Sequence, residues 1–149
     1  MTINVFRNVG GGGNVGGGGK GKKLDMYSSF LRSEGYVPEV DKDGDLVFKV
    51  EGGTYVLFAH EDDPEYFSIL FPGFWPIESE KERSQAYVAA GHATATTKVA
   101  KVYVLQDNVC ASVEMIFGEP EQFKPVFRRA LTMVRGAVAV FAEKMRENR

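Results

Sequence analysis

The stretch whose spacing comes closest to a chemical motif is a glycine-rich run near the N-terminus. Residues 16–22 match the first part of the phosphate-binding loop, in which backbone amides and a lysine hold phosphates. The next position of that loop is Ser or Thr, which binds magnesium, whereas Lys23 stands there in this chain. No βαβ pattern follows the run. Nucleotide binding is therefore disfavoured, and because glycine is costly to order we expect residues 1–23 to form a flexible tail.

Carboxylates and histidines are the next candidates, because they ligate metals. Residues 41–51 are similar to a calcium loop, but such a loop needs glycine at its sixth position and glutamate at its twelfth. Here Gly44 is fourth and Glu51 is eleventh. The two histidines and the single cysteine, Cys110, are too few for a zinc site. The pattern predicts a hairpin turn, a solvated acidic turn at residues 61–65, and no metal or other cofactor.

Nucleophilic catalysis has no motif in this sequence. Neither His-Glu-x-x-His nor Gly-x-Ser-x-Gly occurs. Cys110 lies in an apolar stretch typical of a strand, which favours a buried and inert thiol. A serine, a histidine and an acid could still meet in space, but nothing in the sequence indicates it. We expect a protein that is not an enzyme.

Aromatic residues form the most distinctive cluster. Phe71, Phe74 and Trp75 stand among two prolines and a glycine, which predicts an irregular strand end. Aromatic side chains at such a rim can form a recognition pocket for a protein. The alternatives are a small-ligand sensor or an enzyme with its pocket near Trp75, and side chains that only close the hydrophobic core. We take the three aromatics as candidate binding residues.

The elements that position these residues form a predicted α+β domain over residues 24–149. Apolar residues recur at helical spacing in residues 24–35 and alternate with polar ones from residue 46 to 71, as in antiparallel strands. The predicted strands cover residues 36–40, 46–51, 55–59, 66–71, 99–105 and 109–117. The expected order is helix, three or four strands, helix, two strands, helix, with about five to six strands in an antiparallel sheet.

The longest predicted element is a helix over residues 120–147. Phe123, Phe127, Val134 and Phe141 fall on one wide apolar stripe, and a proline stands in its first turn. Fully burying the large side chains of that stripe contributes at most roughly 10 to 20 kcal/mol. A matching apolar surface must cover it, and the predicted sheet is the candidate.

A second helix, predicted between residues 76 and 98, has small apolar residues. They are Ala86, Ala89, Ala90 and Ala93. Small side chains allow another backbone to approach closely, either the sheet or the same helix of a second subunit. We expect a homodimer with these alanines at its interface.

Charge is distributed unevenly along the chain. The net charge is +4 for residues 1–24, −10 for residues 25–80 and +4 for residues 81–149. An acidic middle argues against nucleic-acid binding and suits a basic segment of another protein. No apolar run approaches the roughly 18 to 20 residues that cross a bilayer. With one cysteine, which agrees with a reducing compartment, we expect a cytoplasmic protein without a membrane partner.

The order of these elements resembles the YbjN-like family of bacterial proteins, which share the type III secretion chaperone-like fold. The resemblance covers residues 24–147 and rests on element order together with segments such as Gly-Thr-Tyr-Val-Leu-Phe at 53–58 and Ala-Lys-Val-Tyr-Val at 100–104. It implies a non-catalytic protein-binding domain, often dimeric, with a chaperone or regulatory role. It supplies no functional residue, because that family has no defined active site, and it does not explain the glycine-rich tail.

Overall fold

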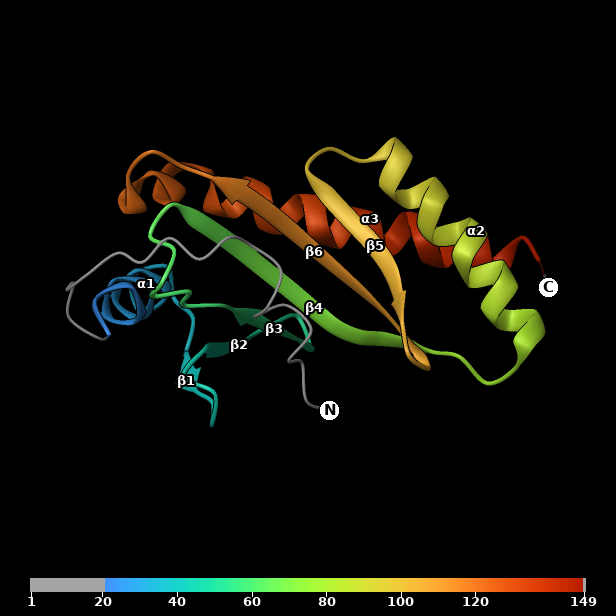
Figure 1. Cartoon of the computed structure of the whole chain (residues 1–149), viewed down its shortest axis with the longest axis horizontal. Helices are drawn as coiled ribbons and strands as arrows, with labels where there is room; N and C mark the ends of the chain where they lie inside the picture. The colour runs from blue at the N-terminus through green and yellow to red at the C-terminus, as the bar shows by residue number, and fades with distance from the viewer. Residues whose placement is uncertain (1–20, 149) are drawn as a thin grey trace.

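The computed structural model describes residues 21–148 and shows a six-stranded sheet with three α-helices and one 3₁₀ segment (Figure 1). In chain order the elements are α1 (Lys22–Ser33), β1 (Glu39–Val40), β2 (Leu46–Val50), β3 (Gly53–Leu57), β4 (Tyr66–Pro76), α2 (Glu80–Thr96), β5 (Ala100–Leu105), β6 (Asn108–Ile116), η2 (Pro120–Val126) and α3 (Phe127–Arg146). The α+β class and the element order predicted from the sequence are confirmed. None of the helices in this described part is both long and apolar enough to span a bilayer.

All neighbouring strands are antiparallel, in the order β1-β2-β3-β4-β6-β5. The β1–β2 hairpin is closed by Asp41, whose Oδ1 accepts hydrogen bonds from the amides of Asp43 and Asp45, each at 2.9 Å. Gly44 sits in this turn at a φ of 83°, where other residues are strained. The acidic residues 41–45 therefore form a hairpin turn, as predicted. After α2 the chain returns at the far edge as β5, and β6 fills the place beside β4.

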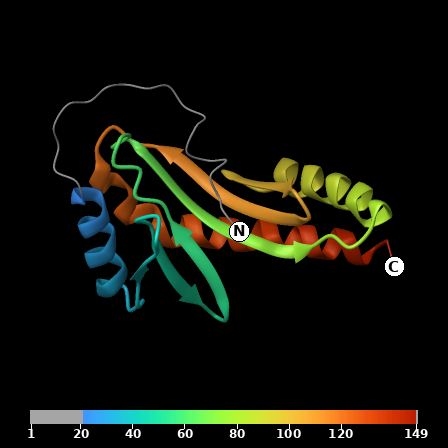
Figure 2. The same ribbon diagram turned by 60° about the horizontal axis from the view of Figure 1, so that its bottom comes forward.

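Helices cover one face of the sheet, here called the inner face: α3 runs along it and α1 lies at one end (Figure 2). Strand side chains alternate between faces, and Phe67 and Ile69 of β4 point inward with 1% and 0% of their surface exposed. Phe127, Val134 and Phe141 of α3 belong to the same buried cluster, each at 0%. The apolar stripe predicted from the helical spacing therefore lies in the core of the protein.

The C-terminal helix is not the single continuous helix expected there. Its first part, η2, is a 3₁₀ segment, and the α-helix starts only at Phe127. Pro125 explains the difference, because it has no amide hydrogen and disfavours α geometry in the preceding residue. Glu119 and Gln122 form a capping box at the start of η2, with the Glu119 amide donating to Gln122 Oε1 at 3.0 Å.

Two strands differ in length from the prediction. Strand β4 continues past Phe71 to Pro76, because a register shift against β6 between Phe71 and Trp75 accommodates Pro72 without breaking the strand. Strand β1 is only two residues long. Pro38 precedes it and cannot donate a ladder hydrogen bond.

The alanines of α2 are buried inside the chain, which corrects the expectation that they form a dimer interface. Ala86, Ala89 and Ala93 are 0% exposed and Ala90 is 4% exposed. Their small size lets α2 lie close to β5, where the Val102 amide donates to Thr94 Oγ1 at 2.9 Å and the Thr94 hydroxyl donates to the Val102 carbonyl at 3.2 Å. The alanines thus serve to close the β5 edge, and a second subunit cannot reach them while α2 stays in place.

Lys23 ties the first turn of α1 to the loop before β4. It is only 5% exposed, and its Nζ donates to the carbonyl oxygens of Tyr66 at 2.7 Å and Asp63 at 3.0 Å. Burial lowers the pKa of Lys23 to about 8, against the opposing attraction of Asp63 and the neighbouring carboxylates. The lysine is therefore held by its hydrogen bonds at some cost in desolvation.

Replacing Lys23 with methionine should lower the free energy of unfolding by about 1 to 3 kcal/mol, because the partly buried carbonyl groups of Asp63 and Tyr66 lose their charged donor. Urea denaturation measures this loss. Exposed Lys22 gives the control, since Lys22→Met should change stability by less than about 0.5 kcal/mol.

The same lysine predicts a pH dependence. The folded state binds the Lys23 proton less tightly than the unfolded state, so the wild type should gain stability relative to Lys23→Met as the pH rises from about 8 to 10.5. A stability difference between the two proteins that stays constant over this range contradicts the assignment.

Candidate functional site

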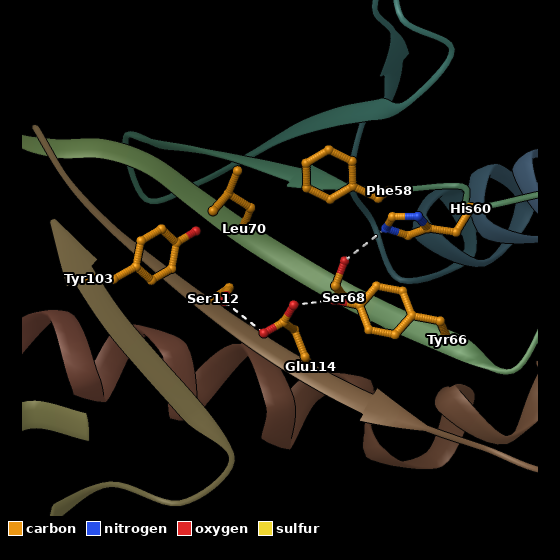
Figure 3. Close-up of a pocket in the computed structure, with 8 residues that line it drawn as sticks. All are labelled: Phe58, His60, Tyr66, Ser68, Leu70, Tyr103, Ser112 and Glu114. Carbon is orange, nitrogen blue, oxygen red and sulfur yellow. Dashed lines mark hydrogen bonds between the residues drawn. The ribbon is translucent and has the colours of Figure 1, made fainter. Parts of the chain in front are cut away.

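The candidate site lies on the face of the sheet opposite the helices, here called the outer face. Its side chains come from every second position of β2 to β6 and from the residue that follows β3: Val47, Val56, Phe58, Ser68, Leu70, Lys101, Tyr103, Cys110, Ser112 and Glu114. In Figure 3 several of them stand on the near side of the strands while α3 passes behind. Within residues 21–148 the buried cluster of this face contains no helix side chain.

Strand register assembles an apolar row across the outer face. Val47 pairs with Val56, Val56 with Leu70, and Leu70 with Ser112. Side chains directly opposite each other on neighbouring strands are close enough to touch. The row therefore runs from β2 to β6 and ends at a polar residue.

Glu114 is the centre of a polar cluster at that end of the row (Figure 3). Its carboxylate accepts hydrogen bonds from the Tyr66 hydroxyl and from Ser112 Oγ, the latter at 3.5 Å, and forms an ion pair with Lys101. Burial, together with the hydrogen bond to Glu114, raises the pKa of Tyr66 above its ordinary value. The tyrosine therefore stays protonated and acts as a donor, and the cluster is a stable set of partners for Glu114.

His60 and Ser68 form a second polar pair beside this cluster. His60 Nε2 and Ser68 Oγ lie 3.5 Å apart. Burial, aided by the charge of Lys23, lowers the pKa of His60 below its ordinary value, so the ring is neutral at pH 7. Because Glu114 bonds Tyr66 and not His60, the three side chains do not form the nucleophile, base and acid of a hydrolase.

The space enclosed by these residues is too small for a metabolite. The cavity in Figure 3 has a volume of about 10 Å³, which is a site for one water molecule. In the described part of the chain no group of three or more His, Cys, Asp or Glu side chains is placed to hold a metal ion. The outer face thus offers a surface for contact and a set of hydrogen bonds.

An acidic hollow adjoins the outer face. It has a volume of about 530 Å³ and is lined by Gly21, Leu24, Asp43, Gly44, Asp45, Phe58, Ala59, His60, Glu61 and Asp62. Two of its acids are structural: Asp45 Oδ1 accepts from the Ala59 amide at 3.0 Å, and Glu61 accepts from the Leu24 amide at the start of α1, also at 3.0 Å. Asp62 lies exposed at the rim. Since Phe58 and His60 also line the outer-face cavity, the hollow and the face form one continuous surface.

The predicted aromatic site lies elsewhere, on the inner side of the bulge in β4. Phe71 stacks on Phe74 with ring centroids 5.5 Å apart, and both Phe74 and Trp75 meet Phe141 of α3 edge-on at 5.4 and 5.5 Å. Trp75 Nε1 donates to Glu82 Oε1 at 3.1 Å. The three aromatics are half-buried and help to close the core, as the alternative interpretation held. A hollow of about 210 Å³ remains beside Trp75, between the start of α2 and the end of α3.

Sequence reasoning missed the outer face. The available signal was the alternation of Ser68 with large apolar residues in one strand and of Ser112 and Glu114 with apolar residues in another. Such positions look like ordinary solvent-facing residues. Only the register shows that Ser68 stands opposite Glu114, and Ser112 opposite Lys101, on a single surface.

Comparison with known proteins supports the fold. No protein-family model and no curated protein matches the sequence. YbjN from E. coli, a proposed transcription regulator, superposes with a TM-score of 0.57 at 12% identity, over 83% of this chain and 93% of its own. The chain has a YbjN-like fold. An uncharacterized protein from Methanothermobacter thermautotrophicus superposes with a TM-score of 0.58 at 13% identity, over 85% of this chain and 98% of its own. At such identities the likeness to YbjN concerns the fold alone.

The Glu114 cluster predicts a measurable coupling. In a double-mutant cycle of Tyr66→Phe and Glu114→Gln, unfolding in urea should give an interaction energy of about 1 to 3 kcal/mol, because the hydrogen bond is charge-assisted and half-buried. A parallel cycle of Tyr66→Phe with Glu121→Gln, at an exposed residue on η2, should be additive. Additivity in both cycles means that Tyr66 and Glu114 do not interact.

Proposed function

We propose that this protein is a non-catalytic binding module that holds an extended segment of another protein against its outer face. The observation that carries the proposal is the outer face itself, where half-buried Val47 flanks the buried Val56 and Leu70 beside the acidic hollow on one continuous surface. Apolar side chains next to a charged hollow match a segment that carries apolar residues and the opposite charge.

The surface defines the chemistry of the segment. Side chains of an extended peptide alternate between its two sides, so apolar residues at every second position match the row. A lysine or arginine near one end matches the hollow, where Asp62 is exposed and Asp43 lies in the adjoining turn. The partner segment is therefore extended, apolar on one side and basic.

Three features support binding over catalysis. The His60 and Ser68 pair has Glu114 engaged elsewhere, and the cavity between them holds no more than a water molecule. The described residues offer no metal cluster. The similar YbjN is a proposed transcription regulator, and a regulator that acts through another protein needs only a binding surface.

A phage-displayed random peptide library, selected on the intact protein, tests the proposal. We expect the selected peptides to carry alternating apolar residues and a lysine or arginine. Val47→Lys should weaken their binding about tenfold or more, because it places a charge in the apolar row. The same substitution at exposed Val37, Val37→Lys, should leave binding unchanged. Peptides that bind Val47→Lys as tightly as the wild type place the binding site elsewhere.

The competing candidate is a small-ligand site in the hollow beside Trp75. That hollow is polar at Lys81, Glu82 and Gln85. Its test is the fluorescence of Trp75, the single tryptophan, titrated with a metabolite library. A saturable shift with one compound, together with no selected peptide, favours the small-ligand candidate.

We also propose that the protein is a homodimer whose interface lies on the exposed side of α2, away from its buried alanines. Tyr87 and Val88 there are 59% and 63% exposed, and these two neighbouring side chains give α2 an apolar surface for a contact. We expect light scattering at micromolar concentration to give a dimer for the wild type and a monomer for Val88→Glu, while Val37→Glu stays dimeric. A monomeric wild type contradicts the dimer.

A further inference from the structure

A hollow on the helix side of the sheet has no part in the proposed contact with a partner segment. It has a volume of about 490 Å³ and lies between Tyr55 of β3 and one side of α3, from Thr132 to Ala142. Sites for small ligands commonly have volumes of about 300 to 1,000 Å³ and combine apolar walls with a few polar groups. Since Tyr55 belongs to the inner core, this hollow is separate from the outer face.

Small side chains form the wall that α3 contributes. Gly136, Ala139 and Ala142 line the hollow, and the first two are exposed. Glycine inside a helix lowers the stability of that helix relative to alanine. A Cβ atom added at Gly136 would have no neighbour within 4 Å beyond its own part of the helix, so packing within the described chain does not require this glycine. The helix therefore leaves room here for a group from outside the chain.

Arg135 gives the hollow a positively charged end. Its guanidinium donates a hydrogen bond to the Glu51 carboxylate and is hydrogen-bonded to the Tyr55 hydroxyl. A guanidinium carries five N–H donors in a planar arrangement that fits a carboxylate. Arg135 is therefore a carboxylate-binding group at the edge of an apolar wall.

The contact of Glu51 with Arg135 is one that another carboxylate can replace. The Glu51 side chain is 74% exposed, and ion pairs between exposed groups contribute little to stability. Glu51 also has a φ of 46°, in the left-handed region that favours glycine, and it stands in the turn between β2 and β3. A ligand carboxylate thus meets only weak competition for the guanidinium.

We propose that this hollow binds a small carboxylic acid with an apolar body. The ligand carboxylate replaces Glu51 on the Arg135 guanidinium. Its apolar body lies against Gly136, Ala139 and Ala142. The charge-assisted hydrogen bond orients the acid, and burial of the apolar body adds affinity. This inference does not rest on the function proposed above, because the two sites lie on opposite sides of the sheet.

Calorimetric titration of the intact protein with octanoate at pH 7 tests the proposal. We expect saturable binding of octanoate and about tenfold weaker binding, or less, of octylammonium and butyrate, which lack the carboxylate and most of the apolar body respectively. Arg135→Gln should weaken octanoate binding about tenfold or more, because the charge-assisted hydrogen bond is lost. Arg129→Gln removes the same charge from an exposed position of α3 and should leave binding unchanged.

Two further variants separate the site from a general loss of structure. Gly136→Leu fills the hollow and should weaken octanoate binding about tenfold or more, although leucine is the better helix former. Glu51→Gln removes the competing carboxylate and should tighten binding about two- to fivefold, the factor that corresponds to an exposed ion pair. A damaged fold does not bind more tightly, so this gain identifies competition at Arg135.

Several outcomes overturn the proposal. Octanoate that does not bind saturably means that the hollow is not a site for such acids. Equal weakening by Arg135→Gln and Arg129→Gln means that octanoate responds only to the positive charge of α3. Binding to Glu51→Gln that is no tighter than to the wild type means that Glu51 and the ligand do not compete. No octanoate binding, together with a dimeric wild type that Gly136→Leu makes monomeric in light scattering, assigns the hollow to an interface between two copies of the chain.

Discussion

The structure depends on the burial of one apolar stripe, formed by η2 and α3, against the inner face of the sheet. Six large side chains of these two elements are buried: Phe123, Phe127, Leu131, Val134, Phe141 and Met145. Their transfer from water contributes roughly 9 to 18 kcal/mol as an upper bound. Strands β4, β6 and β5 lie side by side and all contact α3, a helix of 20 residues.

Placing all the helices on the inner face has a consequence for the outer one. The strands still alternate, so half of their side chains point away from the helices. In most antiparallel sheets that half is polar and meets water. Here it includes Val56, Leu70 and Cys110, all buried, with a polar cluster around Glu114 at one side. This apolar face lies beside the acidic hollow, and it is the surface proposed to hold the partner segment.

Much of the fold could be predicted from local patterns. The helical spacing within α3 and the turn at Asp43 and Gly44 depend only on neighbours in sequence; the turn is confirmed, and the helix is confirmed from Phe127 on. Pro125 was a local signal for the break in the C-terminal helix, and the other errors arose where a distant contact decided the outcome. Strand β4 runs on past Phe71 because β6 lies beside it and tolerates a register shift. The alanines of α2 are buried because β5 lies beside α2 at the edge of the sheet. A local sequence pattern does not predict this position of β5.

The sequence by itself determined the α+β class, the element order and the stripe that forms the core, since periodicity and turn chemistry are local properties. Only the tertiary structure decided the candidate site. Val47, Leu70 and Glu114 lie on different strands, and their proximity depends on register, which the hydrophobic pattern of a single strand does not specify. The alternating serines and acids of β4 and β6 have the same pattern whether they face water or a partner. The arrangement of helices on one face leaves the other face for the proposed contact with a partner.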